Sequence, residues 1–203
     1  MRHVIAVLAI ALVVGGLASC GATRPSKYYE LQVPAAHPQA GGSNAYPVAL
    51  VVGRLTAPHL YRDDRIVYRT GPEQLGTYEY HRWAEPPTEM LEAILLRRLR
   101  ESGRYRSVQL LRSNARGDFI IRGRLHNFEE VSGSPLVARV ALEIELDEVK
   151  TGTTVWSQFY SHDEPVNGKD VSAVVEALNR NVQQGLAQIT DGIEQYFASH
   201  PPK

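Results

Sequence analysis

Apolar and polar positions alternate along this chain with two periods, and the period at each place predicts the secondary structure. Residues 28–33 form a short strand-like run, and Val48 to Leu55 is almost continuously apolar, as in a strand buried on both faces. Arg65 to Arg69 alternates cleanly. Gly71-Pro72 marks a turn, and Leu75 to His81 is the returning arm of a hairpin.

Two later segments have the period of an amphipathic helix. Apolar residues recur at helical spacing between residues 89 and 100, directly after a double proline that stops a strand. A longer apolar stripe runs to Phe197, and Asp170 can cap its start. Gly185 and Gly192 lie inside this second helix, where each costs about 1 kcal/mol relative to alanine, so they mark close packing or a bend.

The remaining strands complete a sheet. They are expected over residues 107–111, 118–130, 137–149 and 154–161. The strand–helix–strand unit from Val48 to Leu111 favours one right-handed parallel crossover. The fold class predicted is α/β, a mixed and largely antiparallel sheet with two main packed helices.

The amino terminus predicts where the protein works. A basic start is followed by the apolar run Val4 to Val14, and Leu17-Ala18-Ser19-Cys20 closes it, as in a secretory signal. The run has about eleven residues, whereas a bilayer core needs about 20 helical residues. Cleavage is therefore expected.

Cys20 is the one cysteine of the chain, so it can form no internal disulfide. Leu-Ala-Ser-Cys matches the bacterial lipobox, in which a diacylglycerol joins the cysteine sulfur. The alternative is an ordinary signal cleaved near Ala18, with a stray thiol. Gly21 stands where an aspartate would retain a lipoprotein in the inner membrane, so the outer membrane, on its periplasmic face, is the expected location.

Cleavage before Cys20 leaves 184 of the 203 residues, a length typical of one domain. We expect a lipoprotein signal peptide (1–19), a lipidated cysteine with tether and edge strand (20–46), a single α/β domain (47–199) and a tail (200–203). A flexible chain spans about 5–6 Å × √n, so about 25 tether residues would keep the domain within roughly 30 Å of the bilayer.

Charge and motif searches point away from several function classes. The 22 basic and 22 acidic side chains form no large block of one sign, so no nucleic acid partner is expected. The histidines lack metal-ligand spacing, and no nucleotide loop or nucleophile elbow is present. We therefore expect no catalytic residues, no metal and no cofactor.

Two charged clusters remain as candidate chemistry. His162-Asp163-Glu164 could supply part of an acid–base set, although a solvated strand end is the simpler interpretation. The segment 61–65, Tyr-Arg-Asp-Asp-Arg, could hold an anion, but its mixed charges favour a self-contained ion-pair network.

Tyrosines gather around the predicted hairpin and could contact a partner. In residues 78–83, simple alternation places Tyr78, Tyr80 and Arg82 on one face and Glu79, His81 and Trp83 on the other. Trp83 is expected to pack at the corner between strand and helix, with a partner-facing position as the alternative. The candidate partner contacts are Tyr61, Arg65, Tyr68, Tyr78 and Tyr80.

Several motifs together resemble a known family. Tyr29-Glu30-Leu31 follows the cysteine, Arg65 to Arg69 forms a strand, and Trp83-Ala84-Glu85-Pro86-Pro87 precedes the first helix. Val174 to Leu178 opens the last helix, and Gly117-Asp118-Phe119 replaces the usual Ala-Asp-Tyr. In these residues the chain resembles the ABC-type transport auxiliary lipoproteins, which include the PqiC component of paraquat-inducible MCE systems, and Trp83, Glu85, Pro86 and Pro87 are its structural markers.

The resemblance implies an outer-membrane-anchored periplasmic domain, similar to the amino-terminal domain of TolB, without known catalytic residues. It implies partners as well: an MCE-domain protein, an ABC permease and an ATPase that move phospholipid or other lipid between the membranes. Assembly into a homo-oligomer is compatible with this role. The alternatives are a structural outer-membrane lipoprotein or scaffold, and an envelope hydrolase acting through His162 or the segment 61–65.

Overall fold

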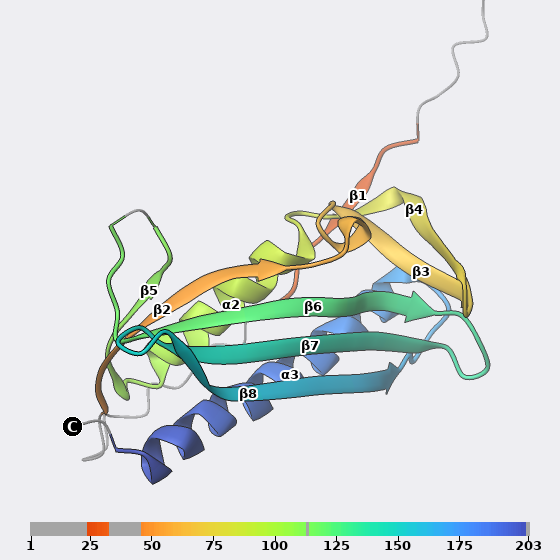
Figure 1. Cartoon of the computed structure of the whole chain (residues 1–203). Coiled ribbons are helices and arrows are strands. Elements are labelled where there is room, and N and C mark those ends of the chain that lie inside the picture. Colours follow the sequence, from red (N-terminus) through yellow and green to blue (C-terminus); the bar gives the residue numbers. More distant parts are fainter. Residues whose placement is uncertain (1–23, 33–45, 113, 202–203) are drawn as a thin grey trace, which may run out of the picture.

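The described part of the protein is one sheet backed by two helices (Figure 1). The computed structural model describes residues 24–32, 46–112 and 114–201; Cys20 and most of the expected tether lie outside these ranges. The strands are β1 (Lys27–Tyr29), β2 (Tyr46–Thr56), β3 (Arg65–Gly71), β4 (Gln74–Trp83), β5 (Tyr105–Leu110), β6 (Phe119–Val131), β7 (Val137–Glu148) and β8 (Thr153–Pro165). The helices are α2 (Pro87–Glu101) and α3 (Val171–Ser199), with a short 3-10 turn, η2 (His59–Tyr61). The predicted fold class is confirmed.

The sheet is organised around β6. β7 pairs with one edge of β6 and β8 pairs with β7, and these two long ladders are antiparallel. The other edge of β6 is shared, because β2 pairs with its first half, from Phe119 to Arg124, and β3 with its end, from Glu129 to Val131. β5 lies beside β2, and β4 and then β1 lie beside β3. β2 and β5 are parallel, as the predicted crossover requires.

The helix ends follow the signals in the sequence. β4 ends at Trp83, Pro86 is the N-cap of α2, and α2 begins at Pro87. Gly103 lies just beyond the last turn of α2, and its φ of 62° favours glycine. Asp170 caps α3, since its side chain accepts a hydrogen bond of 2.9 Å from the amide of Ala173. Neither helix of the described ranges is long and apolar enough to cross a membrane.

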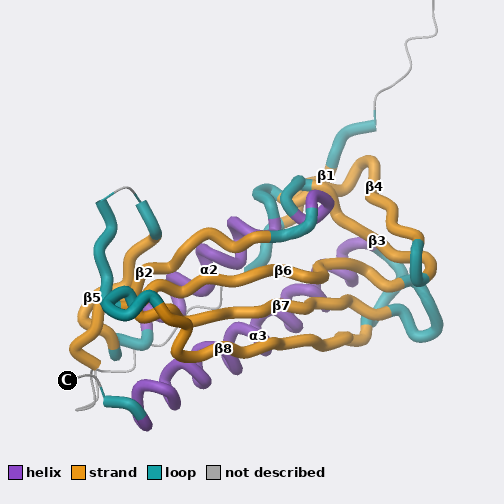
Figure 2. Tube along the Cα trace, in the orientation of Figure 1, coloured by secondary structure: helices purple, strands orange, loops and turns teal. Residues whose placement is uncertain are grey.

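Both helices cover the same face of the sheet (Figure 2), and the apolar residues between the layers form one core. The two glycines of α3 lie where the helix approaches β8 most closely. A Cβ atom on Gly185 would come within 2.6 Å of the Tyr160 ring, and one on Gly192 within 2.7 Å of Trp156. Close packing is therefore the reason for both glycines.

Buried polar side chains connect the layers. Asn181 of α3 is fully buried; its amide donates to the carbonyls of Ala138 and His162 at 2.9 and 2.8 Å and accepts from the Tyr160 hydroxyl at 2.7 Å. Glu92 of α2 accepts from the amide of Leu55 at 2.7 Å, where the register of β2 on β6 shifts. The bond to Glu92 thus satisfies a backbone amide at an interruption of the ladder, and the bonds of Asn181 connect α3 to β7 and β8.

The edge strand β1 belongs to the sheet. It pairs in parallel with the end of β4, and Leu31 just after it is buried. The amide of Gln32 donates to Asn179 Oδ1 at 3.0 Å, and Gln183 Nε2 donates to the Gln32 carbonyl at 2.7 Å. The chain is thus attached to the fold from Lys27 onward, so the expected reach of about 25 free residues is too long.

Candidate functional site

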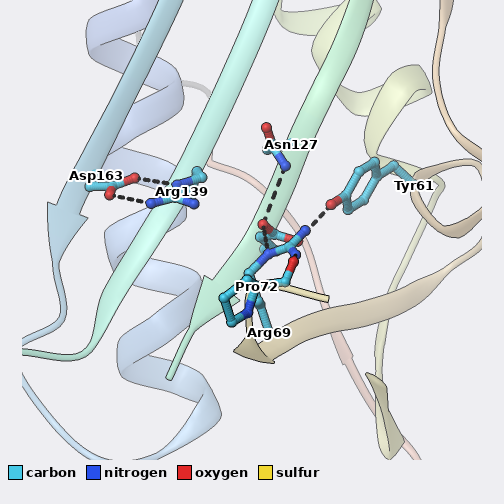
Figure 3. Close-up of polar contacts among 7 residues, drawn as sticks. Tyr61, Arg69, Pro72, Asn127, Arg139 and Asp163 are labelled. Atoms are coloured by element: carbon cyan, nitrogen blue, oxygen red, sulfur yellow. Dashed lines mark hydrogen bonds and ion pairs between the residues drawn. The ribbon is translucent and has the colours of Figure 1, made fainter. Parts of the chain in front are cut away.

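The candidate site is the end of the sheet where the β3–β4 hairpin, η2 and β6 meet. Its centre is Glu129, whose side chain is fully buried near the end of β6. Figure 3 shows Tyr61, Arg69 and Asn127, which surround it. The carboxylate accepts from the Tyr61 hydroxyl at 2.6 Å and from Arg69 Nε at 2.8 Å. Asn127 Nδ2 donates to it at 3.3 Å. Because its oxygens are fully bonded, the site holds a structural carboxylate with no exposed acid for catalysis.

Burial and the Glu129 carboxylate shift the pKa values of the neighbouring Tyr61 and Arg69. Burial, with the hydrogen bond to Glu129, raises the pKa of Tyr61 to about 12. The hydrogen bond to Glu129 raises the pKa of Arg69 above its ordinary value. Tyr61 and Arg69 therefore stay neutral and cationic, respectively, at neutral pH.

Glu130 forms a second buried group on the opposite face of β6, since neighbouring residues of a strand point to opposite faces. It accepts from the Tyr78 hydroxyl at 2.5 Å and from Ser132 Oγ at 3.0 Å. Burial and Glu130 both raise the pKa of Tyr78. The two acids thus hold η2, β3 and β4 to the end of β6.

An irregular register in β4 changes the expected division of its aromatic residues. Arg65 pairs with Arg82 but Val67 pairs with Thr77, so β4 contains three more residues than β3 over this interval. The rings of Tyr78 and His81 consequently lie edge to face, 5.8 Å apart. The prediction from simple alternation, which placed them on opposite faces, is wrong because it assumes a regular ladder.

The outer edge of β4 meets β1 through aromatic and basic side chains. The Tyr29 hydroxyl and His81 Nδ1 are 2.9 Å apart, and their rings stack. The guanidinium of Arg24 lies 5.7 Å from the centre of the Tyr80 ring. Partial burial, followed by Lys27 and Arg24, lowers the pKa of His81, so its ring is neutral at pH 7.

The structure divides the five predicted partner contacts. Tyr61 is buried, with only 3% of its surface exposed, and Tyr78 is half-buried with its hydroxyl bonded to Glu130. Tyr61 is therefore corrected from a surface contact to an interior residue. Arg65 is exposed, and Tyr68 and Tyr80 are partly exposed, so these three stay available to a partner.

The corner between β4 and α2 belongs to the core. Trp83 is 1% exposed, and its ring lies 5.4 Å from that of Phe128. Pro87 is buried, whereas Glu85 is exposed and Pro86 is half-buried. Trp83 thus supports the strand-to-helix corner and cannot contact a partner.

The two charged clusters are occupied by ion pairs. Arg139 holds Asp163 through two bonds of 2.7 Å (Figure 3), and Arg180 Nε lies 2.8 Å from Glu164. These arginines lower the pKa values of both acids, and His162 lies 3.4 Å from Glu164. No nucleophile faces this histidine among its described contacts.

The segment 61–65 is tied in the same way. Arg82 Nη1 lies 2.8 Å from Asp64, and Arg65 lies 3.9 Å from Asp63. The predicted ion pairing is confirmed within the segment for Arg65 and Asp63, whereas Asp64 pairs outside it, with Arg82 of β4. In the described ranges, no group of three or more His, Cys, Asp or Glu side chains could hold a metal ion.

Two surface pockets, of about 630 and 750 Å³, lie at the other end of the sheet. Arg54, Arg122 and Glu143 line the first, and Arg106 and Glu148 line the second. Sites for acyl chains are lined mainly by apolar side chains. Charged side chains share both linings with apolar ones, such as Leu111 in the first pocket and Val48 and Phe119 in the second.

Sequence reasoning missed the buried residues Glu129, Glu130 and Asn181. A signal for the two acids exists in Phe128-Glu129-Glu130-Val131, where consecutive carboxylates interrupt a strand. Asn181 lies in an apolar stripe between Leu178 and Val182 and differs from its neighbours only in polarity. Their partners on other elements are 19 to 68 residues away, and no local pattern identifies them.

Comparison with known proteins identifies one family. The sequence profile of the ABC-type transport auxiliary lipoprotein component matches residues 29–190, from β1 into α3. A search of proteins with curated functions finds no match.

Solved structures share the fold at low sequence identity. Protein XCC0632 from Xanthomonas campestris is 23% identical with a TM-score of 0.70, over 81% of this chain and 92% of its own. An uncharacterized protein is 17% identical with a TM-score of 0.65, over 84% and 99%. Hypothetical protein CT253 from Chlamydia trachomatis is 8% identical with a TM-score of 0.52, over 76% and 99%.

Proposed function

The chain belongs to the family of ABC-type transport auxiliary lipoprotein components, and from this premise we propose that it is a non-enzymatic accessory protein of an MCE/ABC-type transport system. Such a system would move phospholipid or another lipid between the inner and outer membranes. The observation that carries the proposal is the family match, which runs from Tyr29 in β1 to Thr190 in α3 and so takes in the whole sheet.

Attachment to the membrane is assigned to acylated Cys20. One acyl chain binds a membrane only marginally, whereas two or more hold a protein firmly, at about 0.8 kcal/mol per buried CH₂. Gly21 after the cysteine supports the periplasmic face of the outer membrane. The domain would remain there while its partners act.

Docking to an MCE-domain protein, with its permease and ATPase, is the proposed mode of action. Arg65 and Tyr68 are the proposed contacts, because both are accessible on the β3–β4 hairpin. An oligomer of this chain could present several such hairpins to one partner.

Photo-crosslinking tests the docking. A photoreactive residue at Tyr68, in the full lipoprotein co-expressed with its MCE partner, should crosslink to that partner. The same residue at exposed Phe159 on β8 is the matched control. Crosslinking from Phe159 alone would place the contact on β8. If folded, lipidated protein gave a crosslink from neither position, the accessory role would be contradicted.

Two alternatives have separate tests. A structural lipoprotein or scaffold would lack an adjacent MCE protein, permease and ATPase in its gene neighbourhood. An envelope hydrolase would need His162 or His81. We expect His162→Ala and His81→Ala to leave the envelope phenotype intact, and its loss, with folding, export and partner binding preserved, would refute the non-enzymatic role.

A further inference from the structure

We propose that the outer edge formed by β1 and β4 lies against the membrane that holds Cys20 and binds anionic phospholipid headgroups. We call this surface the β1–β4 edge and define it by Arg24, Lys27, Tyr28 and Tyr80. The inference rests on the proposed acylation of Cys20 and adds to it an orientation and a ligand for the folded domain.

The covalent chain limits how far this edge can lie from the anchor. Arg24 is four residues after Cys20, and an extended chain spans at most about 3.3–3.6 Å per residue. Arg24 therefore lies within about 14 Å of the acylated cysteine. Because β1 pairs with β4 and Leu31 is buried, the edge cannot leave this position without opening the sheet.

The side chains on the β1–β4 edge suit a headgroup surface. Tyr28 is 65% exposed, and tyrosine is enriched where apolar and polar phases meet. Arg24 and Lys27 are exposed, and in the described ranges neither pairs with a carboxylate. They are the first basic residues after the anchor, and Glu30 follows them in the chain. Glu79 lies on β4 beside Tyr80, so the two basic residues outnumber the acids that are level with them.

In this orientation, the end of the domain that carries the last turns of α3 lies farthest from the membrane. α3 has 29 residues and is therefore about 44 Å long at 1.5 Å per residue. Gln32, just after β1, bonds to Asn179 near its beginning, whereas Val149 and Lys150 border the pocket beside Tyr196 near its end. Figure 1 shows β1 and the end of α3 at opposite ends of the molecule.

Depth-dependent quenching in proteoliposomes tests this orientation. The thiol of acylated Cys20 is blocked, so Ser26→Cys or Val149→Cys introduces the single free thiol for a fluorescent label. The lipidated protein is reconstituted into vesicles containing a headgroup nitroxide, either with 25% phosphatidylglycerol or entirely of phosphatidylcholine. We expect quenching at residue 26 to be several-fold stronger than at residue 149 and to weaken in the neutral vesicles.

Charge variants separate binding by the edge from simple nearness to the anchor. Each basic residue near an anionic surface contributes on the order of a fivefold change in binding. Arg24→Gln with Lys27→Gln should therefore remove most of the extra quenching seen with phosphatidylglycerol. Arg112→Gln with Lys150→Gln makes the same change of net charge at the other end and should have no effect.

The outcomes distinguish this inference from the proposed function. Protein that is folded but does not float with vesicles would refute the anchor at Cys20. Protein that floats, yet shows equal quenching at residues 26 and 149 or no dependence on lipid charge, would overturn the proposed orientation and leave the anchor intact. Crosslinking of residue 26 to a partner protein, with its label unquenched, would assign the edge to that partner.

Discussion

Single buried polar residues set the position of whole elements in this protein. Glu129 connects η2 and β3 to β6, and Asn181 connects α3 to β7 and β8. Apolar packing is tolerant of small shifts, whereas each of these side chains has partners only in one arrangement. The Tyr105 hydroxyl is the exception, a buried group without a partner in the described ranges.

Glu129→Gln should lower the free energy of unfolding by about 3 kcal/mol, because it leaves the largely buried guanidinium of Arg69 without its counter-charge. Urea denaturation measures this difference. Asp163→Asn is the control on the same face, since its ion pair with Arg139 is partly exposed and should contribute about 1 kcal/mol or less. Equal effects would contradict the central place of Glu129.

Asn181→Leu should also lower the free energy of unfolding, by about 3 kcal/mol. It removes three hydrogen bonds, two that the Asn181 amide donates to the carbonyls of Ala138 and His162 and one that it accepts from the Tyr160 hydroxyl, at about 1 kcal/mol each. Tyr160→Phe removes only the hydroxyl and should cost less than half as much in the same denaturation assay. A smaller loss for Asn181→Leu than for Tyr160→Phe would refute this assignment.

At the scale of elements, contact between α3 and β8 depends on missing side chains. Gly185 lies against the Tyr160 ring, which is itself held by Asn181. The helix thereby approaches the strand more closely than any residue with a Cβ would permit. The contact of Gly185 with Tyr160 and that of Gly192 with Trp156 account for the two glycines inside α3.

Gly185→Ala should destabilise the protein by about 1–3 kcal/mol through overpacking, although alanine raises helix propensity by about 1 kcal/mol. Thermal unfolding would show a lower midpoint. The neighbouring exposed Gln184→Ala should leave the midpoint nearly unchanged. A higher midpoint for Gly185→Ala would mean that α3 is not pressed against β8.

At the scale of the whole molecule, β1, which follows the proposed anchor in the sequence, and the buried carboxylates lie at the same end. β1 pairs with β4, and β3 connects β4 to the end of β6 that carries Glu129 and Glu130. The pocket beside Tyr196 lies near the other end. The bonds of the two acids would therefore resist forces transmitted between the membrane and the sheet.

Stability of the whole fold should decrease in alkaline solution. Burial raises the pKa values of Tyr61 and Tyr160 to about 12 and also raises those of Tyr78 and Tyr105. An acid whose pKa is raised on folding contributes stability below its unfolded pKa, here about 10, and loses it as pH rises toward the folded pKa.

Urea denaturation between pH 8 and 11.5 measures this dependence. Tyr61→Phe should flatten the decline above pH 10, and Tyr28→Phe, at an exposed position, should leave it unchanged. Stability that is constant up to pH 11.5 would show that the tyrosines ionise without opening the fold.

The local pattern of apolar, polar and capping residues was sufficient to predict the secondary structure. The continuous apolar run became β2, the other predicted strands became β3 to β8, and the apolar stripes became α2 and α3. Asp170 and the double proline began the helices where expected. Periodicity and capping act over a few residues, so they are readable without the fold. The anchor at Cys20 is equally local, and it stays a prediction because it lies outside the described residues.

Contacts between residues that are distant in sequence could be identified only in the folded structure. Glu129 meets Tyr61 across 68 positions of sequence, and an irregular ladder in β4 brings Tyr78 to His81 against simple alternation. The place of β1 on the outer edge of β4 likewise shortened the tether. Each depends on which strands become neighbours and in which register, and these are decided by the packing of the whole sheet against its two helices.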